Sequence, residues 1–189
     1  MRTRGILLAM MTMALLSCTK EKTETNTYHT YVIEKGSHES SHGYGEKTTD
    51  SILNFNVIFD SSAIYHDTTE ENAKDINKLF GMSDCGIMHH MNSARIGWRW
   101  HKGNLQLFAY SYCNTKREMA KIGSFHINAE LKCSIICTKG KYIFEVNGKK
   151  VETKRSCNIE EHYLLYPYFG GDETAPHRIK IKILHRKKT

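Results

Sequence analysis

Alternation between apolar and polar residues over short stretches is the pattern that most constrains the fold of this 189-residue chain. Every second residue from Leu53 to Phe59 is apolar, and 177–184 alternates isoleucine with cationic residues. Side chains of a strand point to opposite faces in turn, so a period of two predicts strands that bury one face. The chain is therefore expected to consist mainly of β-strands.

A hairpin turn is the clearest local signal. Asn147-Gly148 separates 142–146 from 149–153, and both stretches are rich in β-forming residues. Asn and Gly tolerate the positive φ angles that the central positions of a two-residue hairpin turn require. Further strands are expected at 28–34, 51–59, 94–101, 105–112, 120–127, 131–138, 162–168 and 177–184.

Only the segment 69–81 has a helical pattern. Thr69 can cap it, acidic residues follow in the first turn, and Gly81 ends it. Ile76 and Leu79 would then share one side of the helix. About ten short strands with one short helix predict an all-β chain that folds as an antiparallel β-sandwich.

The N-terminal stretch predicts a secretory signal with a lipidation site. Arg2 and Arg4 accompany an apolar run, 5–16, that is too short to span a bilayer as a helix. The sequence Leu-Leu-Ser-Cys at 15–18 is similar to a bacterial lipobox, in which the cysteine, here Cys18, is acylated and becomes the new N-terminus. An ordinary signal peptide that happens to contain a cysteine is the alternative.

These signals divide the chain into three parts. Residues 1–17 are the expected signal peptide, 18–27 the lipidated cysteine with a polar, flexible tether, and 28–189 a single β-sandwich domain. Thr19 stands where retention in a bacterial inner membrane commonly requires aspartate, which favours the outer membrane. The expected location is the cell envelope, with the domain facing the periplasm or the exterior.

The charge balance argues against nucleic acid as a partner. Removal of the two arginines of the signal lowers the formal net charge from +7 to about +5, and much of the surplus lies at 185–188. A nucleic-acid surface would need a basic stripe interleaved with stacking aromatic residues. The expected partners are the membrane, through the lipid, and a polymer outside the cytoplasm.

Five cysteines remain after acylation of Cys18, and an odd number cannot pair completely within one chain. One or two disulfides are expected, without an assignment of partners. Cys133 and Cys137 are four residues apart, so a strand places both on one face, where they are interpreted as small buried residues. With a histidine they would be the alternative half of a zinc site. The five are Cys85, Cys113, Cys133, Cys137 and Cys157.

The densest group of chemically active residues lies within 83–100. In the strand expected at 94–101, Arg95 and Arg99 share one face, and their guanidinium groups suit the carboxylate of an acidic sugar. Trp98 and Trp100 share the other face, where they either stack on a sugar or fill the core.

Two histidines and two tyrosines add candidate acid–base groups. His89 and His90 would point to opposite sides of a strand, whereas from a loop both can face one ligand. No Glu-x-x-His or His-x-His frame surrounds them, so no metal is expected there. With Tyr110 or Tyr112 they suit a lyase-like site in which an arginine, Arg95 or Arg99, neutralises a uronate.

A turn between the two prolines of the chain is the second dense region. It contains Gly170-Gly171 and the adjacent carboxylates Asp172 and Glu173, which suit an acid–base pair, a Ca²⁺ site or a solvated turn. Asp172 and His177 are expected at the rim of a binding site. No nucleophile elbow, phosphate loop, dinucleotide motif or metalloprotease motif occurs, so no cofactor is expected and catalysis stays an open question.

Two stretches resemble a family of uncharacterised bacterial lipoproteins and secreted proteins: Asn-Ser-Ala-Arg-Ile-Gly-Trp-Arg-Trp at 92–100 and Tyr-Pro-Tyr-Phe-Gly-Gly-Asp-Glu-Thr-Ala-Pro-His at 166–177. Asp-Ile-Asn-Lys-Leu at 75–79, followed by Gly81 and by Ser-Asp-Cys at 83–85, is similar to the middle of the same family. The resemblance covers residues 50–184. It implies no particular reaction, because none is established for the family.

The order of strands and the Pro-Tyr-Phe-Gly-Gly turn are also similar to jelly-roll sandwiches of the concanavalin A-like lectin and glucanase kind. This resemblance implies a jelly-roll β-sandwich. Glucanases of that fold carry Glu-x-Asp-x-Glu on one strand, which this chain lacks, so the resemblance favours binding over hydrolysis.

The leading hypothesis is a lipid-anchored β-sandwich that binds a glycan or a related polymer. A polysaccharide-degrading, lyase-like enzyme and a purely structural envelope protein are the alternatives. The candidate ligand-binding residues are Arg95, Arg99, Trp98, Trp100, Tyr110, Tyr112, Asp172 and His177.

Overall fold

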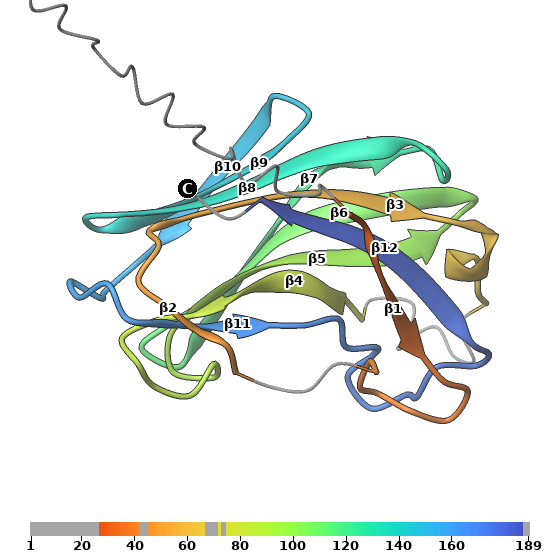
Figure 1. Ribbon diagram of the computed structural model, residues 1–189, viewed down its shortest axis with the longest axis horizontal. Helices are drawn as coiled ribbons and strands as arrows, with labels where there is room; N and C mark the ends of the chain where they lie inside the picture. The colour runs from red at the N-terminus through yellow and green to blue at the C-terminus, as the bar shows by residue number, and fades with distance from the viewer. Residues whose placement is uncertain (1–26, 42–44, 67–71, 73–74, 187–189) are drawn as a thin grey trace, which may run out of the picture.

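The computed structural model describes residues 27–41, 45–66, 72 and 75–186. These residues form two antiparallel sheets of six strands each, which lie against one another as two layers (Figure 1). The antiparallel β-sandwich predicted from the alternating pattern is confirmed.

Sheet A has, in spatial order, the strands β1 (His29–Ile33), β12 (Ile179–Arg186), β3 (Ile52–Phe59), β8 (Glu130–Thr138), β9 (Lys141–Val146) and β10 (Lys149–Lys154). Sheet B has the strands β2 (Lys47–Thr48), β11 (His162–Leu165), β4 (Asn77–Ser83), β5 (Ser93–His101), β6 (Asn104–Cys113) and β7 (Lys116–Phe125). A short 3-10 helix, η1 (Ser61–Ala63), follows β3.

The core lies between the two sheets. Phe55 and Phe59 of β3 contact Phe80 of β4 and Trp98 of β5, with ring centroids 5.1 Å apart in both pairs. All four side chains are almost completely buried. Burial of a large apolar side chain contributes about 1.5–3 kcal/mol, so such cross-sheet pairs hold the layers together.

The hairpin predicted at Asn147-Gly148 is confirmed. Both residues have positive φ angles, 48° and 82°, and β9 pairs with β10 directly across them, with Val146 opposite Lys149. A two-residue turn with positive φ at both positions matches the right-handed twist of the strands that it joins.

The helix predicted over 69–81 is wrong for its C-terminal part. Asn77 to Gly81 belong to β4, between β11 and β5, while most of the segment before residue 75 lies outside the described chain. Leu79 and Phe80 are both buried in the core, and the pairing with β5 shifts register between Lys78 and Phe80. A β-bulge thus buries two consecutive residues, which gives the sequence a spacing that resembles a helical face.

One disulfide, Cys85–Cys157, is present among the described residues. Cys133 and Cys137 are free and buried in the core, on one face of β8, as their even spacing predicted. Cys113 is a free, half-buried thiol at the end of β6.

The expected signal peptide, Cys18 and most of the tether lie outside the described residues. Within the described part of the chain, no helix has the length and apolar character needed to cross a membrane.

Candidate functional site

A cleft of about 500 Å³ lies on the outer face of sheet B. Side chains from β4, β5, β6 and β7 line it, together with the loop 84–92 and the turn 165–172. The lining residues are Glu39, Ser40, Lys78, His89, His90, Ser93, Arg95, Tyr110, Tyr112, Arg117, Leu165, Tyr166, Pro167, Tyr168, Gly170, Gly171 and Asp172.

Strand register brings the polar residues of β5, β6 and β7 together. Arg95 pairs with Tyr110 across β5 and β6, and Tyr112 pairs with Arg117 across β6 and β7. The two tyrosine rings are 5.9 Å apart. Burial and the hydrogen bond with Tyr112 raise the pKa of Tyr110 to about 12, so its phenol stays protonated at neutral pH.

Lys78 of β4 is a cleft residue that is not among the residues predicted from the sequence, because the pattern of its segment predicted a helix. Its Nζ donates a hydrogen bond to the carbonyl oxygen of Gly170 (2.7 Å) and lies 5.5 Å and 5.6 Å from the ring centroids of Tyr110 and Tyr168. Burial, and next the charge of Arg95, lower its pKa to about 8. Lys78 is therefore a cation that is poorly solvated.

The histidines lie at the rim, on the loop 84–92 between β4 and β5. The ring centroids of His89 and His90 are 4.1 Å apart, and His90 contacts the ring of Tyr112 at 5.4 Å. Burial, the neighbouring His90 and the nearby cations lower the pKa of His89 to about 4. The imidazole of His89 is therefore neutral at physiological pH, with a ring nitrogen that holds no proton.

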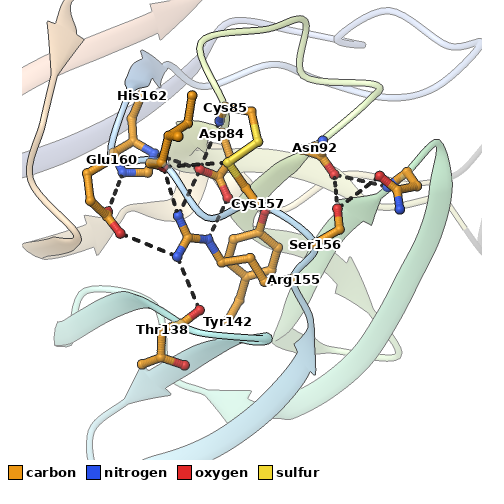
Figure 2. Close-up of a disulfide and its surroundings, with 12 residues drawn as sticks. Asp84, Cys85, Asn92, Thr138, Tyr142, Arg155, Ser156, Cys157, Glu160 and His162 are labelled. Atoms are coloured by element: carbon orange, nitrogen blue, oxygen red, sulfur yellow. Dashed lines mark hydrogen bonds and ion pairs between the residues drawn. A yellow bond between two sulfur atoms is a disulfide. The ribbon is translucent and has the colours of Figure 1, made fainter.

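The base of this loop is held by a buried charge cluster, shown in Figure 2. Asp84 accepts hydrogen bonds from Arg155 Nε (2.7 Å) and Tyr142 Oη (2.7 Å), and His162 Nδ1 lies 3.1 Å from its carboxylate. Burial opposes ionisation of Asp84, but the bonds from His162, Arg155 and Tyr142 outweigh it and hold the pKa of Asp84 well below its usual range. The cluster thus contains a stably ionised, fully paired carboxylate.

The disulfide lies next to this cluster and joins the loop to the segment after β10 (Figure 2). Within the described chain, Asp84, Cys85 and Cys157 are the only group of three or more His, Cys, Asp or Glu residues whose ligand atoms lie close enough to share a metal ion. The two sulfur atoms are bonded to each other and Asp84 is fully paired, so this group is a structural anchor.

Two glycines, Gly81 and Gly97, do not line the cleft but allow close packing of the strands that carry its residues. A Cβ on Gly97 would lie 2.4 Å from Cγ2 of Ile76, and Ile76 packs with Tyr110. A Cβ on Gly81 would lie 2.1 Å from the carbonyl oxygen of Ala94 and 2.6 Å from Cα of Arg95. The lack of a side chain at both positions lets β4, β5 and the preceding segment approach closely enough to place Arg95 and Tyr110.

Four of the predicted ligand residues line the cleft and four do not. Arg95, Tyr110, Tyr112 and Asp172 line it. Arg99 lies outside the cleft on the same strand, where it donates to Gln106 (3.0 Å) and stacks on Phe108. The other three are Trp98, Trp100 and His177.

The tryptophan assignment needs correction. Trp98 has no exposed surface and packs in the core against Phe59, Tyr65 and Phe169, so it has nothing to offer a ligand. Trp100 packs partly against the same core. Both point to the inner side of β5, as large aromatic residues of a sandwich commonly do.

His177 also lies away from the cleft. Its Nε2 is 2.8 Å from the carbonyl oxygen of Ser62 in η1, next to sheet A. The ring therefore holds the turn that precedes β12 and does not contribute to the rim.

Two positively charged side chains of the cleft are more deeply buried than its carboxylates. Arg95 is buried and Lys78 is half-buried, whereas the carboxylates Glu39 and Asp172 are exposed. Arg117 adds an exposed cation. An anionic group that enters the cleft therefore meets positive charge at the bottom.

Comparison with known proteins shows the fold. No protein-family model matches this chain, and no curated protein sequence matches it. Among solved structures it is similar to the alginate lyase AlyC3 (TM-score 0.56, 9% identity, covering 85% of this chain and 74% of that one). The chain has the jelly-roll fold.

Two further structures support this result. The catalytic domain of an endo-1,3-β-glucanase (laminarinase) from Thermotoga petrophila RKU-1 has a TM-score of 0.54 at 10% identity, covering 85% of this chain and 76% of that one. The alginate lyase vAL-1 from Chlorella virus has a TM-score of 0.50 at 14% identity, covering 84% and 82%. The jelly-roll sandwich that the strand order implied is thus confirmed.

Proposed function

We propose that this protein binds an acidic polysaccharide in the cleft of sheet B, with sugar carboxylates facing Lys78 and Arg95. The observation that carries the proposal is the depth of these two side chains, which are the least exposed charged groups of the cleft and are both cations. A poorly solvated cation gains more from a bound anion than an exposed one does. The phenol rings of Tyr110 and Tyr168 beside Lys78 supply apolar area for a sugar ring.

The similar structures agree with this choice of ligand class. Two of them are alginate lyases and one is a laminarinase, so related folds act on polysaccharides. Alginate carries carboxylates, whereas laminarin is neutral, and only the first complements the cations of this cleft.

A binding experiment tests the proposal. Calorimetric titration of the protein with alginate and with laminarin should show binding of alginate only. Lys78→Met should weaken alginate binding at least about tenfold, because a charge-assisted contact contributes about 1.5–3 kcal/mol. Lys139→Met, at an exposed lysine in the turn between β8 and β9, is the matched control and should leave binding unchanged. Equal binding of laminarin, or full binding by Lys78→Met, would overturn the proposal.

A second candidate is β-elimination of a uronate polymer in the same cleft. The specific observation is that the neutral imidazole of His89 and the protonated phenol of Tyr110 line one cleft with Arg95. A base would take the proton next to the carboxylate, the bond to the glycosidic oxygen would break, and an acid would protonate that oxygen.

This activity has its own readout. Each cleavage creates an unsaturated uronate that absorbs ultraviolet light, so a lyase would raise the absorbance of an alginate solution over time. Binding without any rise in absorbance over a long incubation would rule out the lyase and leave the binding proposal intact.

We further propose that Cys18 carries a lipid that anchors the domain to the cell envelope, with the outer membrane as the favoured site. The basis is the sequence signal at 1–18 and the polar tether that follows it.

A further inference from the structure

The tip of the loop 84–92 is a closed turn with an unusual set of side chains. Its sequence is Met88-His89-His90-Met91, and the amide of Met91 donates to the carbonyl oxygen of Met88 (2.9 Å). A turn closed by this bond keeps its first and last Cα atoms within about 7 Å. Two thioethers and two imidazoles thus belong to four consecutive residues of one closed turn.

The two methionine side chains are accessible from solvent, and the two histidine rings lie close together. Met88 is 68% exposed and Met91 is 43% exposed, so both thioethers are accessible to an ion from solvent. The two imidazole rings are 4.1 Å apart between centroids. Neighbouring residues of a strand would point apart, and the turn is what brings both rings to one side.

The turn is held in place from its base. Asp84 donates its amide to the carbonyl oxygen of Asn92 (2.9 Å), which closes the loop, and Thr115 donates its amide to the carbonyl oxygen of Met91 (3.0 Å). The disulfide Cys85–Cys157 fixes the same base (Figure 2). A ligand set on an anchored turn needs little reorganisation to bind an ion.

We propose that the turn Met88–Met91 is a binding site for Cu(I), with the imidazoles of His89 and His90 and the thioethers of Met88 and Met91 as its donors. Thioethers are soft ligands that select Cu(I), and imidazole also suits copper. The set contains no thiolate or carboxylate, so it cannot offset the charge of a divalent ion. The nearby cations Lys78 and Arg95 add a further penalty for divalent charge, which favours a monovalent ion.

The site does not depend on the proposed glycan binding. A Cu(I) ion would occupy the imidazoles at the rim, whereas the proposed carboxylate contacts with Lys78 and Arg95 lie at the floor. Only the second candidate, β-elimination, shares a residue with the Cu(I) site, because it uses His89. Loss of one function therefore leaves the other measurable.

Nuclear magnetic resonance of isotope-labelled methionine methyl groups tests the proposal directly. The described chain has four methionines, and two of them, Met82 in the core and Met119 on β7, are internal controls. Anaerobic titration with Cu(I), or with Ag(I) as a substitute that does not change oxidation state, should shift the methyl signals of Met88 and Met91 and leave Met82 and Met119 unchanged. Equal shifts of Met119, or no shift of Met88 and Met91, would overturn the proposal.

Competition with a Cu(I) chelator gives the affinity. The double variant Met88→Leu/Met91→Leu keeps the apolar volume and should weaken Cu(I) binding at least about tenfold, and His90→Asn should do the same. Met119→Leu is the matched control. Cys113→Ser removes the half-buried free thiol and should retain binding; if Cys113→Ser alone abolishes it, the thiol and not the turn is the site, and the proposal fails.

Discussion

Lys78 and Gly170 lie 92 positions apart in the sequence, yet Nζ of Lys78 donates a hydrogen bond of 2.7 Å to the carbonyl oxygen of Gly170. The backbones meet in the same place, because the amides of Lys78 and Tyr168 each donate to the carbonyl oxygen of the other residue. These bonds attach the turn 165–172 to β4 and build one wall of the cleft. The same contact removes Lys78 from water and gives the cleft its positive floor.

Binding of alginate should depend on pH through Lys78. Its pKa is lowered to about 8, so the side chain is charged below that pH and neutral above it. Affinity should therefore be constant from about pH 6 to 7 and fall as the pH rises through about 8. Calorimetric titrations across this range measure it, and Lys78→Met should show no such fall. A wild-type affinity that is flat through pH 9 would contradict this role.

Asp84→Asn should destabilise the protein strongly. The substitution removes the buried carboxylate that pairs with Arg155 and His162 and leaves them only the partly exposed Glu160, and breaking a buried ion pair costs about 3–5 kcal/mol. Urea denaturation at neutral pH measures the change in the free energy of unfolding. Glu152→Gln is the control: it removes an exposed ion pair with Lys141, whose nitrogen–oxygen distance is 2.8 Å, and should cost less than about 1 kcal/mol.

The same carboxylate predicts a loss of stability in acid. The pKa of Asp84 is lower in the folded chain than the value of about 3.9 in the unfolded chain. Its contribution is thus complete above about pH 4 and is lost as the pH falls through the folded value. Denaturation at successively lower pH should show a steeper loss for the wild type than for Asp84→Asn, and parallel losses would argue against this assignment.

Alanine at Gly97 or at Gly81 should reduce stability, with unequal effects. Gly97→Ala forces its Cβ against a methyl group of Ile76 and should cost about 1–3 kcal/mol. Gly81→Ala meets backbone atoms of Ala94 and Arg95, which cannot move aside, so its cost should be larger. Comparison of the two thermal midpoints checks the order, and a Gly81→Ala variant as stable as the wild type would contradict the close approach of β4 and β5.

Cys18→Ser should abolish lipid attachment. Bacterial cells grown with a labelled fatty acid should incorporate label into the wild-type chain and none into the variant, because the acyl group needs the thiol. Cys113→Ser is the matched control and should remain labelled. Label in Cys18→Ser would show that the lipobox assignment is incorrect.

Much of the strand content followed from local patterns. The period of two placed Arg95 on one face of β5, and Tyr110 and Tyr112 on one face of β6, and all three line the cleft. The same period placed Trp98 on the opposite face of β5. Neighbouring residues could not show whether that face binds a sugar or packs in the core, because this depends on the other sheet. Burial of Trp98 against Phe59 of the other sheet answers it.

The sequence by itself determined most of the strands, the hairpin turn at Asn147-Gly148 and the face on which the residues of those strands lie, because these depend on residues within a few positions of one another. Only the tertiary structure decided that Lys78 joins Arg95 and Tyr110 in a cleft, that His89 lies at its rim and that Cys85 pairs with Cys157. These relationships depend on which distant segments lie side by side. The packing of the two sheets decides which distant segments become neighbours. It also explains β4, where a bulge between Lys78 and Phe80 accommodates a sequence with helix-like spacing in a strand.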